Sequence, residues 1–231
     1  MRTRIAALLM LLYCFPPGAL AQPGSNAATT GEDRAAFIVR CRRETVAQSP
    51  GAAAQAEAIC GSKWDMVTAT RPLGDAVLSL APGPGILFDP AGARGRLTAV
   101  RWNTKGAEGS VAVGRLGEIE VRVLQTPVPG ATFDWFKDGT PIPFDLPETL
   151  KVHGATLAMV GCHDLGASEG GRVYRVTAPG KAPFALSISF REAAVAGQSS
   201  SFTATADYSG QLPTLTALRR DGSEWSTTCP M

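Results

Sequence analysis

The sequence predicts an α+β protein, in which an N-terminal disulfide-linked helical hairpin is followed by an antiparallel all-β domain, a sandwich or an open barrel. Two observations carry this prediction. Apolar residues recur at helical spacing up to residue 81, whereas from residue 95 onward they alternate with polar ones, as in strands. Four of the five cysteines follow residue 21, two in each part, so each part can hold its own disulfide.

Residues 1–21 have the pattern of a cleavable secretory signal peptide. Two arginines precede an apolar run, and a Pro-Pro-Gly break leads to Ala-Leu-Ala at 19–21, which is typical of a cleavage site. The run is much shorter than the roughly 18 apolar residues of a membrane-spanning helix. Lipidation at Cys14 is the alternative, but the bulky Tyr13 before it favours cleavage after Ala21. We therefore expect a periplasmic or secreted protein with no transmembrane segment in the mature chain.

The charge balance argues against nucleic-acid binding. The chain has 22 Lys and Arg against 20 Asp and Glu, and two of the arginines, Arg2 and Arg4, lie in the expected signal peptide. The mature chain is then formally neutral, whereas a nucleic-acid binder needs a surplus of basic side chains to displace counterions from phosphates. The same balance argues against attachment to an anionic membrane surface.

The first part of the mature chain predicts two helices. Residues 22–31 are small and polar, which indicates a flexible lead-in, and residues 32–81 form the expected helical hairpin around a turn at 48–51. Cys41 and Cys60 are equidistant from this turn, so they meet at one level of the hairpin. A disulfide between them contributes roughly 3 kcal/mol in the chain-entropy model.

A break is expected inside the second helix. Because Pro lacks the backbone N–H, Arg71-Pro72 predicts that this helix ends and that Leu73–Leu80 forms a short third helix. Residues 82–94, rich in Pro and Gly, predict a linker to the β domain.

Residues 95–231 predict the β domain, with roughly 8 to 10 short strands and no helix longer than a turn. The candidate strands are 97–102, 110–116, 118–123, 133–137, 156–162, 172–177, 184–190, 201–208, 214–219 and 224–228. Pairing Cys162 with Cys229 is the connectivity that keeps both disulfides inside their own parts, and it would hold the last strand.

The spacing of three segments in this part resembles that of strands B, C and F in immunoglobulin-like domains. The segments are 117–123, 135–139 and 171–176. Val123 and Val176 stand where the inter-sheet cysteines of that family would be. The resemblance covers about a quarter of the chain and implies a two-sheet sandwich.

Two motifs are candidates for chemistry. Residues 166–170 match the G-x-S-x-G pattern of serine hydrolases around Ser168, but a strand pattern rather than a helix follows, and both histidines precede the serine. Cys162-His163-Asp164 brings three metal-ligating residue types together, yet neighbouring strand residues point to opposite faces. We therefore expect no metal site and no cofactor.

A histidine provides the remaining catalytic candidate. His153 has a side chain that titrates near neutral pH, and Asp145 or Glu148 would orient it if a loop folded back. An envelope hydrolase using Ser168 or His153 is therefore the alternative function.

Three tryptophans are the candidate binding residues: Trp102, Trp135 and Trp225. Exposed aromatic side chains stack on sugar rings and on peptide side chains, although at strand spacing one face of such a set is normally buried. With two histidines and no credible triad, the sequence favours a non-catalytic binding or interaction module of the bacterial cell envelope, with an envelope protein or a glycan as its partner.

Overall fold

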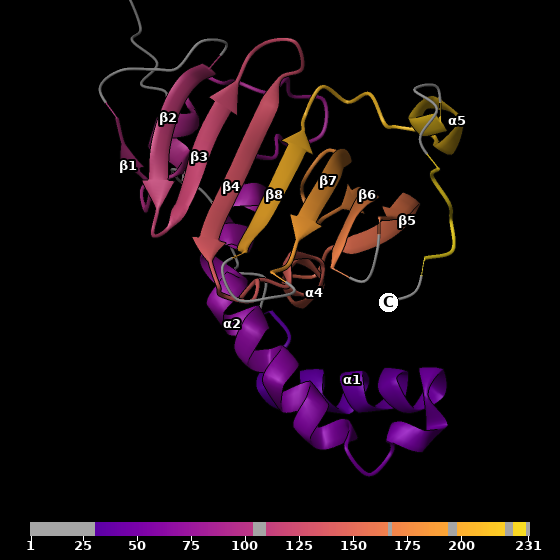
Figure 1. Cartoon of the computed structure of the whole chain (residues 1–231). Coiled ribbons are helices and arrows are strands. Elements are labelled where there is room, and N and C mark those ends of the chain that lie inside the picture. The colour runs from indigo at the N-terminus through magenta and orange to yellow at the C-terminus, as the bar shows by residue number, and fades with distance from the viewer. Residues whose placement is uncertain (1–30, 104–109, 166–167, 194–197, 220–223, 230–231) are drawn as a thin grey trace, which may run out of the picture. The chain divides into compact units, whose positions relative to one another are not determined.

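The computed structural model of the protein describes residues 31–103, 110–165, 168–193, 198–219 and 224–229 (Figure 1). Its helices are α1 (Arg34–Gln48), the short 3-10 helix η1 (Pro50–Ala52), α2 (Ala56–Leu80), α3 (Ala93–Arg96), α4 (Leu146–Val152) and α5 (Leu215–Leu218). Its strands are β1 (Arg101–Trp102), β2 (Ser110–Leu116), β3 (Ile119–Leu124), β4 (Gly130–Asp138), β5 (Thr156–Asp164), β6 (Glu169–Thr177), β7 (Phe184–Arg191) and β8 (Ser199–Asp207). The protein is therefore α+β, as expected, with helices followed by an antiparallel sheet.

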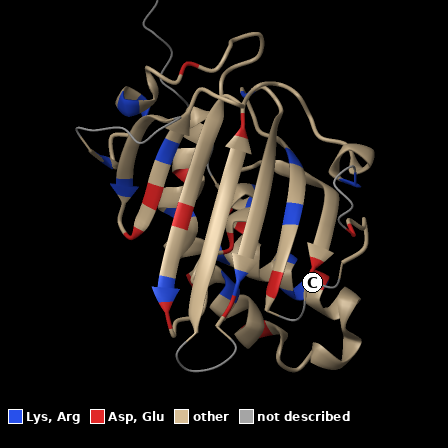
Figure 2. Ribbon diagram, turned by 45° about the horizontal axis from the view of Figure 1, so that its top comes forward, with Lys and Arg blue, Asp and Glu red and all other residues tan. Residues whose placement is uncertain are grey.

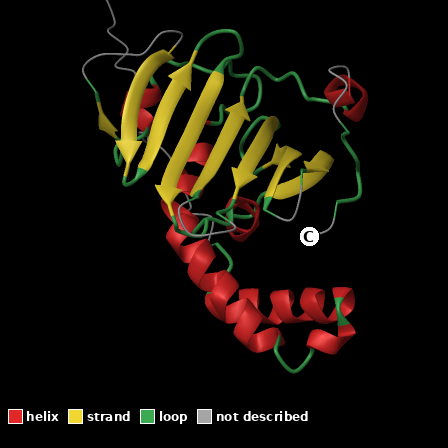
Figure 3. Cartoon of the chain, in the orientation of Figure 1, coloured by secondary structure: helices red, strands yellow, loops and turns green. Residues whose placement is uncertain are grey.

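The eight strands form one antiparallel sheet in the order β1-β2-β3-β4-β8-β7-β6-β5. Two runs of sequential strands are joined where β4 pairs with β8. A sandwich would bury the apolar face of one sheet against another, whereas here α2 and α4 lie against that face (Figure 3). β4 and β6, which carry two of the three immunoglobulin-like segments, are separated by β8 and β7, so the strand order is not that of an immunoglobulin-like domain.

The main core lies between the sheet and α2. Strand side chains alternate between the two faces, so Phe133, Leu186 and Phe202 from three neighbouring strands point to the same side. There they pack with Leu73 and Val77 of α2. Along the strands, Lys and Arg residues are interspersed with Asp and Glu residues (Figure 2).

Helix α2 does not break at Arg71-Pro72, contrary to the prediction. It runs to Leu80 with Pro72 inside it. Proline removes one backbone hydrogen bond, but Leu73 and Val77 continue the buried face of the helix. The hydroxyl of Tyr208 also donates to the carbonyl of Val77, at 2.7 Å. Packing against the sheet therefore outweighs the local cost of proline.

The α1–α2 hairpin has its own small core. The expected Cys41–Cys60 disulfide joins the two helices, and the buried Phe37 and Val67 pack beside it. The indole of Trp64 lies 5.3 Å from the ring of Phe37, measured between ring centroids. Cross-link and apolar contacts together hold α1 onto the first half of α2.

Helix α4 was not expected, because this part of the chain was assigned strands and loops. The carboxylate of Asp145 caps it by accepting a hydrogen bond from the backbone N–H of Glu148. Gly74 of α2 allows a close approach, since a Cβ there would lie 2.7 Å from the side chain of Thr149. Arg40 joins α1 to α4 through an ion pair of 3.0 Å with Glu148.

Two predicted strands differ in the structure. In the segment 97–102 only Arg101–Trp102 pairs, as β1, because α3 and a turn occupy the residues before it. The segment 214–219 is helical instead: the hydroxyl of Thr214 accepts a hydrogen bond from the backbone N–H of Ala217 and begins α5. Helix capping therefore overrides the alternating pattern there.

The C-terminal segment 224–228 is not a strand either. Ser226 forms an isolated bridge with Cys162 of β5, with backbone hydrogen bonds of 2.8 and 2.7 Å. The expected Cys162–Cys229 disulfide fixes this segment at the edge of the sheet. Gly161 leaves room for it, since a Cβ there would lie 3.3 Å from the ring of Trp225.

Candidate functional site

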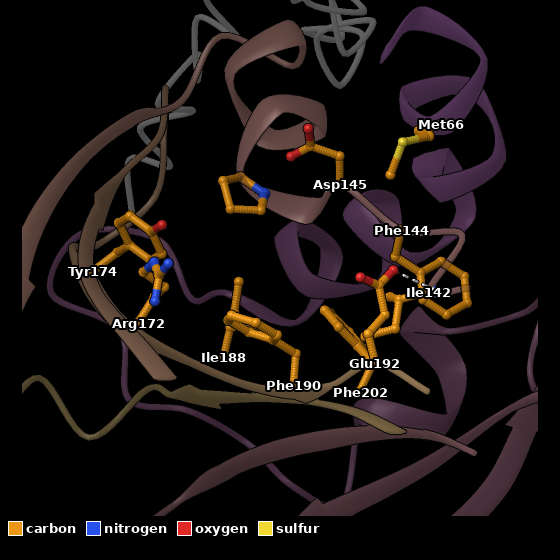
Figure 4. A pocket seen from close by; sticks show the side chains of 11 residues that line it. Met66, Ile142, Phe144, Asp145, Arg172, Tyr174, Ile188, Phe190, Glu192 and Phe202 are labelled. Atoms are coloured by element: carbon orange, nitrogen blue, oxygen red, sulfur yellow. Dashed lines mark hydrogen bonds between the residues drawn. The ribbon is translucent and has the colours of Figure 1, made fainter. Parts of the chain in front are cut away.

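A pocket of about 230 Å³ lies between the buried face of the sheet and the two helices α2 and α4 (Figure 4). Its walls come from α2, from the segment that joins β4 to α4, and from strands β6, β7 and β8, with Glu192 directly after β7. The lining residues are Met66, Ile142, Phe144, Asp145, Pro147, Arg172, Tyr174, Ile188, Phe190, Glu192 and Phe202.

The register of the sheet builds the floor of this pocket. Phe190 of β7 stands opposite Phe202 of β8, and Ile188 stands opposite Arg172 of β6. Tyr174 is two residues beyond Arg172, so it points to the same face. Phe202 and Ile188 are almost fully buried, whereas Tyr174 and Phe190 are partly exposed and present their rings to the pocket.

Phe144 forms the wall opposite Tyr174 in this view (Figure 4). Its ring centroid lies 5.5 Å from that of Trp135, edge to face, and 5.4 Å from that of Phe202. Such aromatic pairs contribute about 0.5–1.5 kcal/mol each beyond the area that they bury. The ring of Phe144 is thus held in place from behind by the core.

Polar groups stand among these apolar walls. Arg172 donates to a carboxylate oxygen of Asp164 at 2.7 Å, and its guanidinium lies 5.3 Å from the ring centroid of Phe190. Burial raises the pKa of Asp145 above its ordinary range, although the backbone N–H of Glu148 donates to it. Burial likewise raises the pKa of the Tyr174 phenol. A ligand in this pocket would meet rings, a carboxyl group and a phenol together.

A second hollow, of about 470 Å³, adjoins the first and shares Phe144 with it. It lies between α2, with Ala69, Pro72 and Leu73, and the turn that joins β2 to β3. The hollows follow one side of α2, and Phe144 stands between them.

The three candidate tryptophans lie in different places and form no common surface. Trp135 is 3 % exposed and belongs to the core, as is usual for an aromatic residue on the inner face of a strand. Trp102 is partly buried on the edge strand β1, packed against the core. Trp225 packs edge to face on His163, with ring centroids 4.5 Å apart. None of the three lines the pocket, but Trp135 packs on Phe144, which does.

The two residues of the alternative hydrolase lie apart. His153 ends α4 directly before β5, while Ser168 follows the far end of β5, at the turn into β6. The nine-residue strand between them spans about 25–30 Å. Residues 166 and 167 of the G-x-S-x-G motif lie outside the described residues.

The expected partners of His153 are engaged elsewhere. Asp145 caps the other end of α4, and Glu148 pairs with Arg40 and Lys151. The carboxylate beside His153 is that of Asp75, 3.5 Å from the imidazole Nε2, and this contact is too long or misaligned to count as a hydrogen bond. The geometry therefore brings neither expected acid to His153.

The residues 162–164 offer no converging ligand set. Cys162 is oxidised in the disulfide with Cys229, and His163 lies over Gly171 and against Trp225. In the described part of the chain no group of three His, Cys, Asp or Glu side chains is placed to hold a metal ion. None of the helices there is both long and apolar enough to cross a bilayer.

Sequence reasoning missed the residues that form the pocket. A signal was present in the segment 141–147, Pro-Ile-Pro-Phe-Asp-Leu-Pro, where apolar side chains alternate with prolines. Closely spaced prolines favour an extended backbone that cannot join a central strand, so apolar residues there must pack against another element. In the structure this segment carries Ile142, Phe144 and Asp145 to the pocket.

No family model, curated protein or solved structure shows significant similarity to the chain.

Proposed function

We propose that the protein is exported to the periplasm or the exterior of a bacterial cell and acts there as a non-catalytic binding module. The signal-peptide pattern of residues 1–21 supports export, and two disulfides suit an oxidising compartment. The separation of Ser168 from His153 gives no support to the hydrolase alternative.

The ligand we propose is a small, largely apolar molecule that enters the pocket beside Phe144. The observation that carries this proposal is the combination of partly exposed rings with a few polar groups in one concave site. An apolar cavity of about 150 Å³ accommodates benzene, so a pocket of about 230 Å³ has room for a phenyl ring with a short substituent. The lining of this pocket does not include the candidate binding residues Trp102, Trp135 and Trp225.

Isoleucine methyl groups provide a direct test by NMR. Ile142 and Ile188 line the pocket, whereas Ile59 lies near the start of α2 and serves as an internal reference. Titration with 2-phenylethanol should shift the first two methyl signals and leave the third unchanged. A ligand of this size binds with a dissociation constant of about 2 mM if each heavy atom contributes roughly −0.4 kcal/mol.

A blocking variant and a matched control complete the test. Met66→Trp places a larger side chain in the wall of the pocket, whereas Thr68→Trp adds the same side chain at an exposed position of the same helix. We expect the first variant to abolish the shifts and the second to retain them. Unchanged Ile142 and Ile188 signals in the unmodified protein would overturn the proposed site.

A further inference from the structure

The charged groups of the pocket differ in whether the protein supplies a countercharge for them. Arg172 is already bound to the carboxylate of Asp164 and to the carbonyl of Gly171, at 2.7 and 3.2 Å. Its positive charge is therefore matched within the chain.

The two carboxylates that line the pocket have no such countercharge beside them in the described part of the protein. Asp145 accepts from the backbone N–H of Glu148 at 3.2 Å, and Glu192 accepts from the backbone N–H of Ile142 at 3.3 Å. In the described part of the protein neither carboxylate has an ion pair within 4.0 Å to a Lys, Arg or His side chain. Asp145 is the more buried of the two, and a buried carboxylate without a countercharge costs free energy that a bound cation recovers, whereas Glu192 is exposed to solvent.

The rings of the pocket favour the same kind of ligand. The face of an aromatic ring carries partial negative charge and attracts cations, most strongly when both are shielded from water. Phe144 and Tyr174 stand on opposite sides of the pocket, with Asp145 above the space between them in the same view (Figure 4). The chain itself already uses such a contact, that of Arg172 over Phe190.

From this charge pattern, and resting on the proposed function of the pocket, we infer that the ligand is an organic cation: a small molecule with an apolar body and an ammonium group. The ammonium group lies against the carboxylates of Asp145 and Glu192, and the apolar body lies against Phe144, Tyr174 and Ile188. An anionic ligand would meet two carboxylates and an arginine that is already bound. A neutral ligand would leave the carboxylate of Asp145 without a countercharge.

Binding of a cation is then linked to the ionisation of Asp145. Burial raises the pKa of this carboxyl, the charge of Glu148 raises it further, and Lys63 and Lys151 lower it. Arg172, Tyr174 and Glu192 face the same pocket from the strand side. Because a cation binds to the ionised carboxylate, its affinity must fall as the pH drops through the raised pKa of Asp145.

Three probes that share a phenylethyl body and differ in the polar group test the inference by the same isoleucine signals. They are 2-phenylethyl trimethylammonium, whose charge does not change with pH, the neutral 2-phenylethanol and the anionic 3-phenylpropanoate. We expect the cation to bind about tenfold more tightly than the alcohol and the anion to bind most weakly. The affinity of the cation should fall in acid while that of the alcohol stays constant.

Variants of the two carboxylates test which of them causes the preference for the cation. Asp145→Asn keeps a helix-capping side chain, so the fold is retained. It should bring the cation within about threefold of the alcohol and reduce the pH dependence to the smaller part that Glu192 contributes. Glu192→Gln should weaken the cation by a smaller factor, because Glu192 is exposed. Glu57→Gln, at the exposed start of α2, is the control and should change nothing.

The outcomes separate this inference from the proposed function. Binding of the alcohol or the anion at Ile142 and Ile188 as tightly as the cation would overturn the inference and keep the site. Retention of the cation preference in Asp145→Asn would also overturn the inference. If none of the three probes shifts these signals, both proposals are wrong.

Discussion

Removal of the Cys41–Cys60 disulfide should destabilise the α1–α2 hairpin by an amount that the structure fixes. The two cysteines are separated by 19 residues. In the chain-entropy model a loop of this length corresponds to about 3 kcal/mol of stabilisation at room temperature. The double variant Cys41→Ser and Cys60→Ser removes this cross-link and leaves the other disulfide in place.

The small size of the hairpin core limits what else can hold α1. Phe37 is fully buried, and burial of one such ring contributes about 1.5–3 kcal/mol. Arg40 adds ion pairs of 2.8 Å to Glu32 and 3.0 Å to Glu148, and these are partly exposed. These contacts are of the same order as the entropy gained by the reduced chain, so α1 should detach at a lower denaturant concentration than the sheet unfolds.

Urea unfolding followed by far-UV circular dichroism measures this effect. With a denaturant slope of at most about 3 kcal/mol per M, the loss moves the midpoint of the helical transition down by at least about 1 M. Thiol titration must show that Cys162 and Cys229 remain oxidised in the variant. A midpoint that moves by less than about 0.2 M would refute the reasoning, since the cross-link would then add nothing to the hairpin.

Three further predictions concern the core, the pocket and the C-terminal segment. Tyr208→Phe should lower the free energy of unfolding by about 1 kcal/mol in urea titrations, because it removes the hydrogen bond to Val77 while the ring still packs; no measurable loss would contradict the role of that bond. Asp145→Asn should be more stable than the unmodified protein at neutral pH and equally stable in acid, because the native state has a raised carboxyl pKa and loses stability as the pH rises through it; parallel unfolding curves across the pH range would contradict this. Cys229→Ser should free the C-terminal segment, which limited proteolysis detects as cleavage before Trp225 with the sheet intact; unchanged resistance would show that the Ser226 bridge suffices.

The sequence predicted those features that depend on local pattern and on symmetric spacing. Cys41 and Cys60 lie at equal distances from the turn, and the structure joins them. Strand alternation located β2 with its observed bounds, Ser110–Leu116, and placed β7 and β8 to within two residues. These signals survive because every second side chain of a strand lies on the buried face of the sheet.

Where the sequence prediction failed, packing between distant parts of the chain outweighed the local sequence signal, or a local signal was overlooked. Pro72 predicts a helix end, but the sheet buries the apolar residues on both sides of it, so α2 continues. Asp145 and Glu148, three residues apart, match a helix-capping pattern that the strand interpretation overlooked. The strand order, with β8 between β4 and β7, depends on contacts across the chain that alternation does not encode.

The pocket could not be predicted for the same reason. Its aromatic residues come from a proline-rich connection and from strands that are far apart in sequence. The sequence around each of them is that of an ordinary core residue. The tryptophans are binding candidates by residue type alone, whereas in the structure Trp135 supports the site by packing on Phe144.

The most direct test of a binding function in the pocket is identification of the molecule that it carries. The protein should be exported in bacterial cells, purified without denaturation and compared with Met66→Trp and Thr68→Trp by nondenaturing mass spectrometry. Our account predicts a small organic molecule, charged and largely apolar, bound to the unmodified protein and to Thr68→Trp but lost from Met66→Trp. The same small-molecule content in all three proteins, or none in any of them, would contradict it.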